Sequence, residues 1–260
     1  MRRYRYNYQT IIRFSIPVRR HFFLLRCMPC VNAFQQISRR DLFLAPKESV
    51  IYGADSWKNP IQYGSILKPH DSFMFVSSGE ARMEPYGMPI ERDFYKDLFL
   101  VQTPSTTVTD DMKQFLEEKR GGLSGLELAK ALAVELYNYM AYTPGSTSVT
   151  TTAAQAFNQR AGVCQDYSQI LIALCREARI PARYANGFIT GLGTTHAWVE
   201  VCQDGRWYGI DPTNNVTEMD FGYIKITHGR DVSDCIVCKY RYDGLGAQEQ
   251  LEVRIIVEEI

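Results

Sequence analysis

Three residue types that perform nucleophilic catalysis occur in the second half of the chain, in the order Cys164, His196 and Asp211. A cysteine thiolate attacks carbonyl carbons, an imidazole moves protons, and a carboxylate orients the imidazole. The set predicts acyl chemistry at an amide bond through a thioester. Because each residue alone commonly has a structural role, the prediction depends on elements that bring all three together.

The first of these elements is a helix predicted from about Cys164 to Arg179, ending before Pro181. Gly162 allows a tight entry, so Cys164 lies on the first helical turn. The free N–H groups and partial positive charge of a helix N-terminus favour the thiolate, and they can also hold a developing oxyanion. This position distinguishes Cys164 from the other six cysteines. The alternative for Cys164 is a small buried packing residue.

The second element is a hairpin around Asp204-Gly205, a dipeptide typical of two-residue turns. This turn pairs Gln203 with Arg206. His196, Trp198 and Glu200 then share one face of their strand, because side chains alternate. Asp211 lies on that same face, diagonal to His196, at about 7–8 Å between backbones. A register slip of one residue would turn Asp211 to the opposite face.

Other candidate site residues have weaker support. Gln159, or Asn158, precedes Cys164 and is a candidate side-chain donor to an oxyanion, with ordinary loop polarity as the alternative. Tyr167 and Trp198 are candidates for lining the cleft. Packing in the core is the alternative for both, since Tyr167 belongs to the predicted apolar stripe of its helix.

The order of elements predicts an α+β fold with a β-rich first part, then helices, then strands. Ile12, Phe14, Ile16 and Val18 alternate as in a half-buried strand. We expect a helix capped by Asp110 or Asp111 that stops at Gly121-Gly122. A second helix is expected to begin with a capping box of Ser124 and Glu127 and to end at Pro144-Gly145.

Three segments are expected along the chain. Residues 1–104 form an N-terminal β-sandwich domain, and residues 105–230 form the catalytic core. Residues 231–260 contain a closing strand, in which Leu251, Val253, Ile255 and Val257 alternate. This strand either completes the core or returns to the N-terminal domain.

Composition restricts the class of partner. The formal net charge is zero, so a basic nucleic-acid-binding surface is not expected.

Arginines interrupt every apolar stretch near the N-terminus, and nothing resembles a signal peptide or a transmembrane helix. We therefore expect a cytoplasmic protein with no membrane partner and with reduced thiols, since an odd count of seven cysteines argues against a disulfide framework.

Two cysteine pairs have the spacing of metal ligands, namely Cys27 with Cys30 and Cys235 with Cys238. They would form a zinc site only if the ends of the chain met. Strand positions explain them equally well, so no metal or other cofactor is expected.

Four segments around these residues resemble the transglutaminase-like superfamily, and more narrowly its microbial members described as cysteine proteases. The order Cys, His, Asp matches the family, and one segment departs from its pattern by having Arg179 where the family has glycine. The segments are 162–167 (GVCQDY), 179–184 (RIPARY), 195–201 (THAWVEV) and 207–213 (WYGIDPT). The match is good over residues 105–225. It is weaker over the N-terminal part, which is similar to the β-sheet domain preceding the core in bacterial members.

The resemblance implies a papain-like core, in which a helix bearing Cys164 packs on an antiparallel sheet bearing His196 and Asp211. It implies acyl transfer from a peptide or protein amide, to water in hydrolysis or to an amine in cross-linking. Calcium is not carried over, because the chain has no acidic calcium loop. The alternative function is a binding or scaffolding module that keeps the fold without the chemistry.

Overall fold

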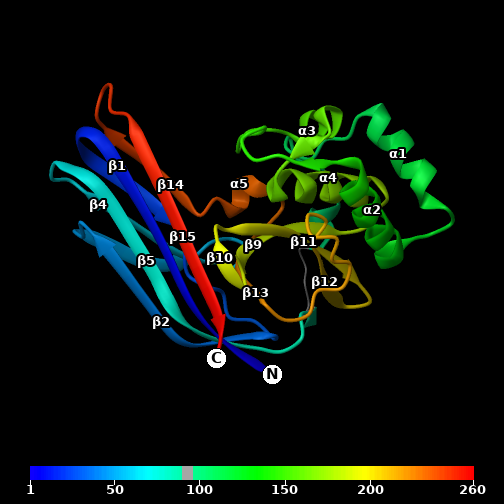
Figure 1. The fold of residues 1–260 in the computed structure, drawn as a ribbon, viewed down its shortest axis with the longest axis horizontal. Helices are drawn as coiled ribbons and strands as arrows, with labels where there is room; N and C mark the ends of the chain where they lie inside the picture. The colour runs from blue at the N-terminus through cyan, green and yellow to red at the C-terminus, as the bar shows by residue number, and fades with distance from the viewer. Residues whose placement is uncertain (90–95) are drawn as a thin grey trace.

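The structure, a computed structural model, describes residues 1–89 and 96–260 of the chain. It has two lobes (Figure 1). One lobe consists of long strands, and the other has helices on one face of a second sheet. The mixed α/β content agrees with the α+β class predicted from the sequence.

The N-terminal lobe is organised by β1 (Arg2–Leu25), in which tyrosines and other apolar residues are buried at alternate positions. The first half of β1 pairs with β5 (His70–Met83) and β15 (Glu249–Glu259). Its second half pairs with β4 (Pro60–Ile66) and β14 (Cys238–Asp243). Two outer strands complete the lobe: β2 (Gln35–Ala45) on β5 and β3 (Ser49–Ala54) on β4.

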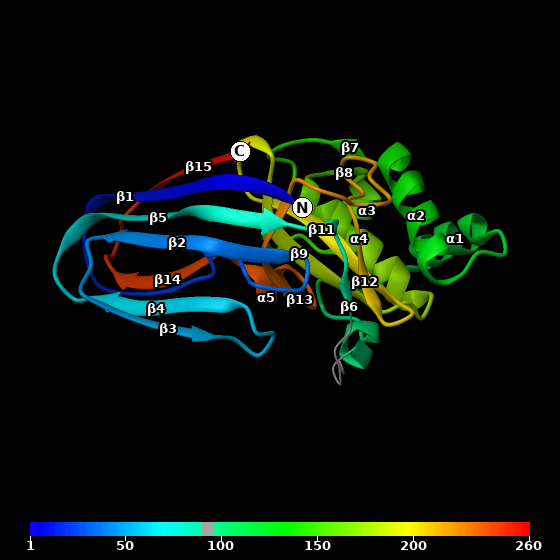
Figure 2. The ribbon, with the colours of Figure 1, turned by 90° about the horizontal axis from the view of Figure 1, so that it is seen from below.

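These strands form one hydrogen-bonded sheet, because β1 belongs to both halves and its register with β5 shifts between Arg13 and Val18. Figure 2 shows β1, β5, β2, β14, β4 and β3 one above another in this lobe. A separate β-rich N-terminal lobe is therefore present. The division into the two sheets of a sandwich stays a prediction.

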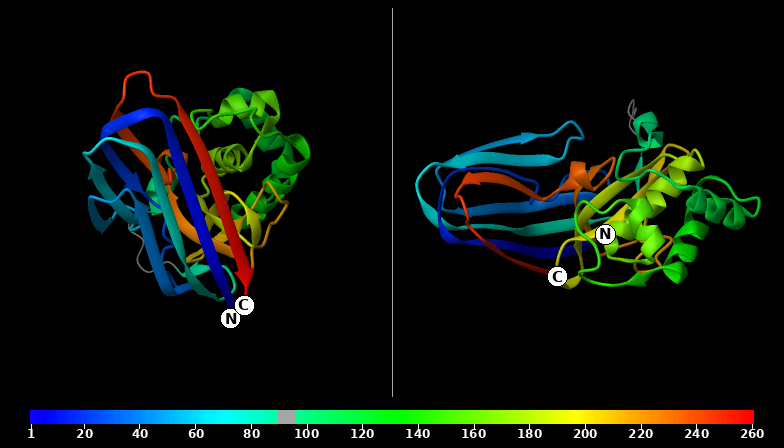
Figure 3. Two further views of the ribbon diagram at one scale, coloured as in Figure 1. Left: turned by 60° about the vertical axis from the view of Figure 1, so that its left-hand side comes forward. Right: turned by 90° about the horizontal axis from the view of Figure 1, so that it is seen from above.

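The two ends of the chain lie side by side on this lobe (Figure 3). Tyr4 pairs with Glu259, and β14 and β15 flank the two halves of β1. The C-terminal segment is thus part of the N-terminal sheet. The far edge of β15 pairs with β10 (Gly191–Gly193), a short strand that comes from the other lobe.

The second lobe has an antiparallel sheet in the order β13-β9-β11-β12-β6. Its helical face is covered mainly by α4 (Cys164–Glu177), which packs on β9 and β11 together with α2. The remaining strands are β6 (Met88–Pro89), β9 (Ala182–Ile189), β11 (His196–Gln203), β12 (Arg206–Ile210) and β13 (Tyr223–Gly229). The remaining helices are η1 (Lys96–Leu100), α1 (Asp110–Arg120), α2 (Gly125–Tyr139), α3 (Ala153–Gln159) and α5 (Val232–Cys235).

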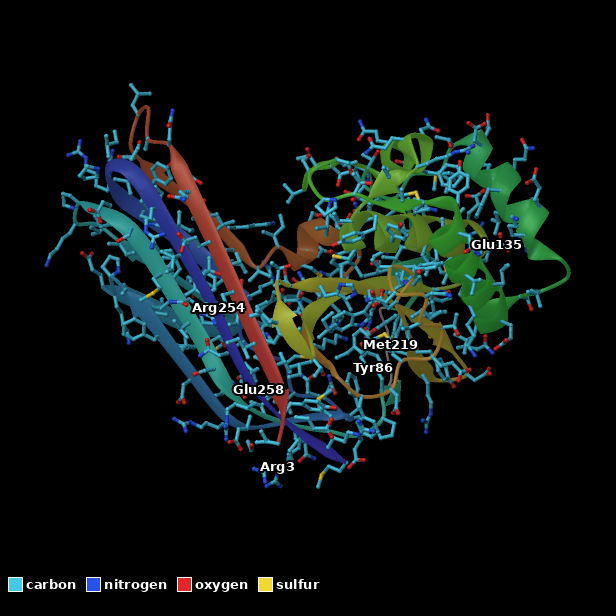
Figure 4. The ribbon with its side chains drawn as sticks, viewed as in Figure 1. Arg3, Tyr86, Glu135, Met219, Arg254 and Glu258 are labelled. Carbon is cyan, nitrogen blue, oxygen red and sulfur yellow. The ribbon has the colours of Figure 1, made fainter. Side chains whose placement is uncertain are left out.

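The two faces of β11 contact different cores. Ala197, Val199 and Val201 pack against the helices, whereas Trp198 packs in the core shared with the N-terminal lobe. Tyr86 and Met219 lie on this second side, away from the helices (Figure 4). The predicted alternation, with His196, Trp198 and Glu200 on one face, therefore fits the packing.

The helix termini correct three predictions. Thr109, rather than Asp110 or Asp111, caps α1 by accepting from the backbone N–H of Met112. Ser124 makes no side-chain cap bond, because the Gln203 side chain accepts from the N–H of Leu126 instead. α2 ends at Tyr139, before Pro144, because residues 141–142 form β7, which pairs with β8 (Ala161–Gly162). The stop of α1 at Gly121 is confirmed, and that glycine has a φ of 51°.

The departure from the family pattern at Arg179 also has a structural explanation. Arg179 follows α4 with a φ of 62°, in the left-handed region that favours glycine. Its backbone N–H still donates to the carbonyl of Arg176, and that of Ile180 donates to the carbonyl of Cys175. The chain therefore leaves α4 through an arginine in a strained backbone conformation.

The predicted hairpin register is confirmed. Gln203 pairs with Arg206 and Val199 with Ile210, while Asp204 and Gly205 have φ values of 47° and 74°, as a two-residue type I′ turn requires. The pairing between β11 and β12 stops one residue pair earlier than predicted. Asp211 does not pair with Trp198 but forms an isolated bridge with Val216.

Candidate active site

Cys164 is the first residue of α4, as predicted, and its side chain is partly exposed. The buried Asp166 side chain fixes the entry to the helix by accepting from the N–H of Val163 at 2.8 Å and from the hydroxyl of Thr147 at 2.6 Å. A Cβ at Gly162 would lie 2.7 Å from Asp166, so a side chain at this position would displace the carboxylate. Gly162 and Asp166 together therefore position the thiol.

His196 and Asp211 form a direct pair. The distance from His196 Nε2 to Asp211 Oδ2 is 2.7 Å, and the Asp211 side chain is fully buried. Although the ladder ends at Ile210, the bridge to Val216 keeps Asp211 at the place that the hairpin register predicted. The pair leaves His196 Nδ1 for another partner.

Cys164 is the other group that acts on His196. Burial would lower the pKa of His196, but its interactions with Asp211 and Cys164 outweigh burial and raise this pKa to about 10. At neutral pH the carboxylate and the nearby cysteine therefore hold the imidazole in its charged form. A charged imidazolium beside a cysteine is the arrangement that activates a thiol nucleophile.

Two further residues hold Asp211, and the sequence prediction missed both. Asn214 Nδ2 donates to Asp211 Oδ2 at 2.7 Å, and the Tyr223 hydroxyl donates to the same oxygen at 3.0 Å. Burial opposes ionisation of Asp211, but hydrogen bonds from His196, Asn214 and Tyr223 outweigh it and lower its pKa. Asn214 lies three residues after Asp211, a spacing that suggests a local turn contact. Tyr223 comes from β13, and no local signal indicates it.

Cys164 and His196 open into a cleft of about 370 Å³. Tyr142, on β7, lines it beside Cys164, because β7 pairs with β8 immediately before α4. Thr213 and Asn214 line another part of the cleft. Ile189 of β9 and five residues of the tip between β9 and β11 also line it, and Ile255 of β15 contributes from the N-terminal lobe. Tyr142 was also missed, because the predicted helix extended through its position.

The two residues predicted to line the cleft do not line it. Trp198 is fully buried in the core between the lobes, where its Nε1 donates to the Tyr86 hydroxyl at 2.7 Å. Tyr167 is buried in the helical core against which α4 packs. The packing alternative is therefore the correct one for both. Each is a large aromatic residue near a catalytic candidate, but its side chain points into a core.

The structure also places Gln159 outside the cleft of Cys164. Its side-chain amide donates to the carbonyls of Ser146 and Ala161, both at 3.1 Å. Both Gln159 and Asn158 line a separate surface hollow and not the cleft of Cys164. Gln159 therefore holds the loop before α4, and the structure does not support it as an oxyanion donor.

The cysteine pairs do not converge on a metal site. The ends of the chain do meet, since Leu25 pairs with Cys238. However, the Cys30 thiol donates to the carbonyl of Lys225, and the Cys235 thiol contacts the carbonyl of Tyr184. Within residues 1–89 and 96–260, no group of three histidine, cysteine or acidic residues could hold a metal ion.

Among the described residues, no helix is both long enough and apolar enough to span a membrane.

The raised pKa of His196 predicts how stability depends on pH. Histidine in an unfolded chain titrates near 6.5, whereas His196 in the folded protein titrates at about 10. Its contribution to the free energy of unfolding is therefore fully present below pH 6.5 and is lost as the pH rises through 10. Urea unfolding should show the stability advantage of the wild type over His196→Gln shrinking between pH 6.5 and 10. An advantage that stays constant over this range would contradict the ion pair.

Comparison with known proteins identifies two matched regions in the chain. Residues 113–212 match the transglutaminase-like superfamily core, and residues 4–82 match the bacterial transglutaminase-like N-terminal region. An uncharacterised protein of Mycobacterium leprae is 26% identical, over 96% of both chains. One from Mycobacterium tuberculosis is 34% identical, over 42% of this chain and 40% of its own.

The fold is also similar to a solved structure. The crystal structure of a putative cysteine protease from Cytophaga hutchinsonii aligns with a TM-score of 0.83 at 21% identity, over 100% of this chain and 91% of that one. The similarity extends over both lobes. The two matched regions also follow each other in the order expected from the sequence. The chain therefore has a core of the transglutaminase-like superfamily at residues 113–212, which follows a bacterial transglutaminase-like N-terminal region at residues 4–82.

Proposed function

We propose that the protein is a cysteine-dependent enzyme that cleaves or exchanges amide bonds of peptides or proteins through a thioester. The observation that carries this proposal is the His196–Asp211 pair at 2.7 Å in an open cleft, together with Cys164, which lies at the start of α4, lines the same cleft and acts on the same imidazole. If the Cys164 thiol were not a nucleophile, the charged imidazole of His196 near this partly exposed cysteine would have no evident structural role. No cofactor or metal takes part in the proposed reaction.

In the proposed mechanism, the Cys164 thiolate attacks the carbonyl carbon of the amide, and a C–S bond forms. His196 then donates its Nδ1 proton to the amide nitrogen, the C–N bond breaks, and the amine leaves a thioester on Cys164. Water or an amine next attacks the thioester and gives a proton to His196, and the thiolate leaves again. Asp211 stays ionised throughout and holds the imidazole in place.

The oxyanion of the tetrahedral intermediate needs hydrogen-bond donors near Cys164. The backbone N–H groups of the first turn of α4 are available by their position. Tyr142 is the proposed second donor. It lines the cleft, and burial, followed by the charge of Cys164, raises the pKa of its hydroxyl, which therefore keeps its proton.

Replacing Tyr142 by phenylalanine should therefore lower kcat by about 10²-fold, since this removes one oxyanion donor. The rate of alkylation of Cys164 by iodoacetamide should change little, because that reaction forms no oxyanion. Tyr137→Phe is the matched control, since Tyr137 is an exposed tyrosine on α2. If Tyr142→Phe had the kcat of Tyr137→Phe, Tyr142 would not be a donor.

The alternative function is a binding or scaffolding module in which the chemistry is silent. Such a module would tolerate a sealed thiol or one that is distant from the imidazole. The partial exposure of Cys164, its place in the same cleft as His196 and its effect on the pKa of His196 favour the enzyme. Trapping the acyl-enzyme with a peptide library, followed by mass spectrometry, tests the proposal. A peptide adduct on Cys164 is expected, and a chain that forms none although iodoacetamide labels Cys164 would support the silent module.

A further inference from the structure

The cleft is built by both lobes. The tip between β9 and β11 extends away from the core sheet, and its strand β10 pairs with β15, with Gly193 opposite Ile255. Ile255 itself lines the cleft. A second contact fixes the other side of the tip, where the N–H of Thr190 donates to the carbonyl of Gly222 at 3.0 Å. The wall opposite Cys164 therefore depends on the N-terminal lobe for its position.

The opening of the cleft has large apolar side chains. Leu192, at the centre of β10, is 73% exposed. Tyr142, on the Cys164 side, is 57% exposed. Both side chains line the cleft and are large and open to solvent, so they are suited to contact a ligand that binds in it.

The inner lining is neutral. Apart from His196 and Cys164, the described residues that line the cleft are threonines, aliphatic residues, a glycine, an asparagine and a tyrosine. Threonine hydroxyls, including those of Thr194 and Thr195, can donate to and accept from amide groups. None of these lining residues supplies a charge that would compensate an ionised side chain of a substrate. A charged group seated against the wall between β9 and β11 would lose its hydration without gaining a charged partner from that wall.

We infer that the β9–β11 tip, held by β15, is the wall on which the acyl donor binds as an extended peptide segment, and that this wall selects segments whose reacting residue is uncharged. This inference rests on the proposed function and specifies its substrate. It also assigns a role to the N-terminal lobe, which positions the specificity wall.

Gly193 allows a direct test. A Cβ at this position would meet no atom within 4 Å, and the residue lines the cleft. A valine there would add bulk at the lining of the cleft without clashing with the fold. Gly87→Val is the matched control, since a Cβ at Gly87 also meets open space and Gly87 is not among the cleft residues.

The probes are three chloromethyl ketones, derived from acetyl-Ala-Gln, acetyl-Ala-Glu and acetyl-Ala-Lys, together with iodoacetamide. Each ketone alkylates the Cys164 sulfur with loss of chloride, so the measurement requires binding in the cleft but no turnover. The wild type should react at least about tenfold faster with the glutamine probe than with either charged probe. Gly193→Val should lower the glutamine rate by about tenfold or more and should leave the iodoacetamide rate within about twofold.

The outcomes separate the two proposals. Equal rates with all three ketones, or a Gly193→Val variant that reacts like Gly87→Val, would overturn the specificity wall while leaving the thiol chemistry intact. Failure of iodoacetamide to label Cys164 in the wild type would overturn the proposed function, and the wall with it. Leu192→Lys provides a further check, since a cation at the mouth should shift preference toward the glutamate probe.

Discussion

Replacing Cys164 by alanine is expected to abolish turnover, with a loss of about 10⁴-fold or more, because no other group can form the thioester. Asp211→Asn should lower kcat by a similar factor of about 10⁴, since an amide cannot hold the imidazole in the required tautomer. Turnover of a peptide identified by trapping provides the measurement. Both variants should keep the near-UV circular dichroism of the wild type.

The control for Cys164→Ala is Cys202→Ala. Cys202 is also partly exposed, but it lies at the far end of β11 from His196. This variant should retain full turnover. If Cys164→Ala kept more than a small fraction of the wild-type activity, the nucleophile would have to be another group, and the proposed mechanism would be wrong.

The second large effect concerns stability. Replacing Glu200 by glutamine should lower the free energy of unfolding by about 3–5 kcal/mol, because it removes one partner of a buried ion network. Glu200 is fully buried and accepts from Arg183 at 2.6 Å, from Lys225 at 2.7 Å and from the Tyr86 hydroxyl at 2.6 Å. Burial opposes ionisation, but Arg183 and Lys225 outweigh it and lower the pKa of Glu200 to about 2.

Urea unfolding at pH 7 provides this measurement, with Glu135→Gln as the control. Glu135 lies on the helical lobe (Figure 4) and pairs with Lys119 at 2.8 Å, with its side chain 38% exposed. Loss of such a surface pair should change the stability by about 0–1 kcal/mol. Equal effects of the two substitutions would contradict the ion network. The stability that Glu200 contributes is present above pH 4.5 and is lost as the pH falls through 2.

The network also connects the lobes. Tyr86 reaches Glu200 from the chain that follows β5, and the Gln35 side chain accepts from the backbone N–H of Lys225 at 2.7 Å. Strand alternation predicts that Glu200 lies on the same face as His196, but it does not identify the residues that pair with Glu200. Arg183 lies on β9 and Lys225 on β13, whereas Tyr86 lies in the segment between β5 and β6. Residues this far apart meet only in the folded chain.

The parts of the site that follow local rules were predictable. The start of α4 at Cys164 follows from Gly162 and the helical periodicity, and the position of Asp211 follows from the turn at Asp204-Gly205. Both rules depend on backbone geometry within a few residues. The face shared by His196 and Glu200 follows from the same alternation.

The surroundings of the site were not predictable in this way. Trp198 and Tyr167 are close to catalytic candidates in sequence, but their side chains pack in cores. Tyr142 and Ile255 reach the cleft because β7 pairs with β8 and β10 pairs with β15. These pairings join segments from distant parts of the chain, and no periodicity in the sequence encodes them.

The central claim is that His196 activates Cys164, and competitive labelling by iodoacetamide tests it most directly. Cys164, Cys202 and Cys238 are the partly exposed cysteines among those described, and burial raises the pKa of Cys238 to about 12. Cys164 should be labelled at least about tenfold faster than either, because a thiolate and not a thiol is the nucleophile. This advantage should disappear in His196→Gln. Equal labelling of the three cysteines in the wild type would contradict the account.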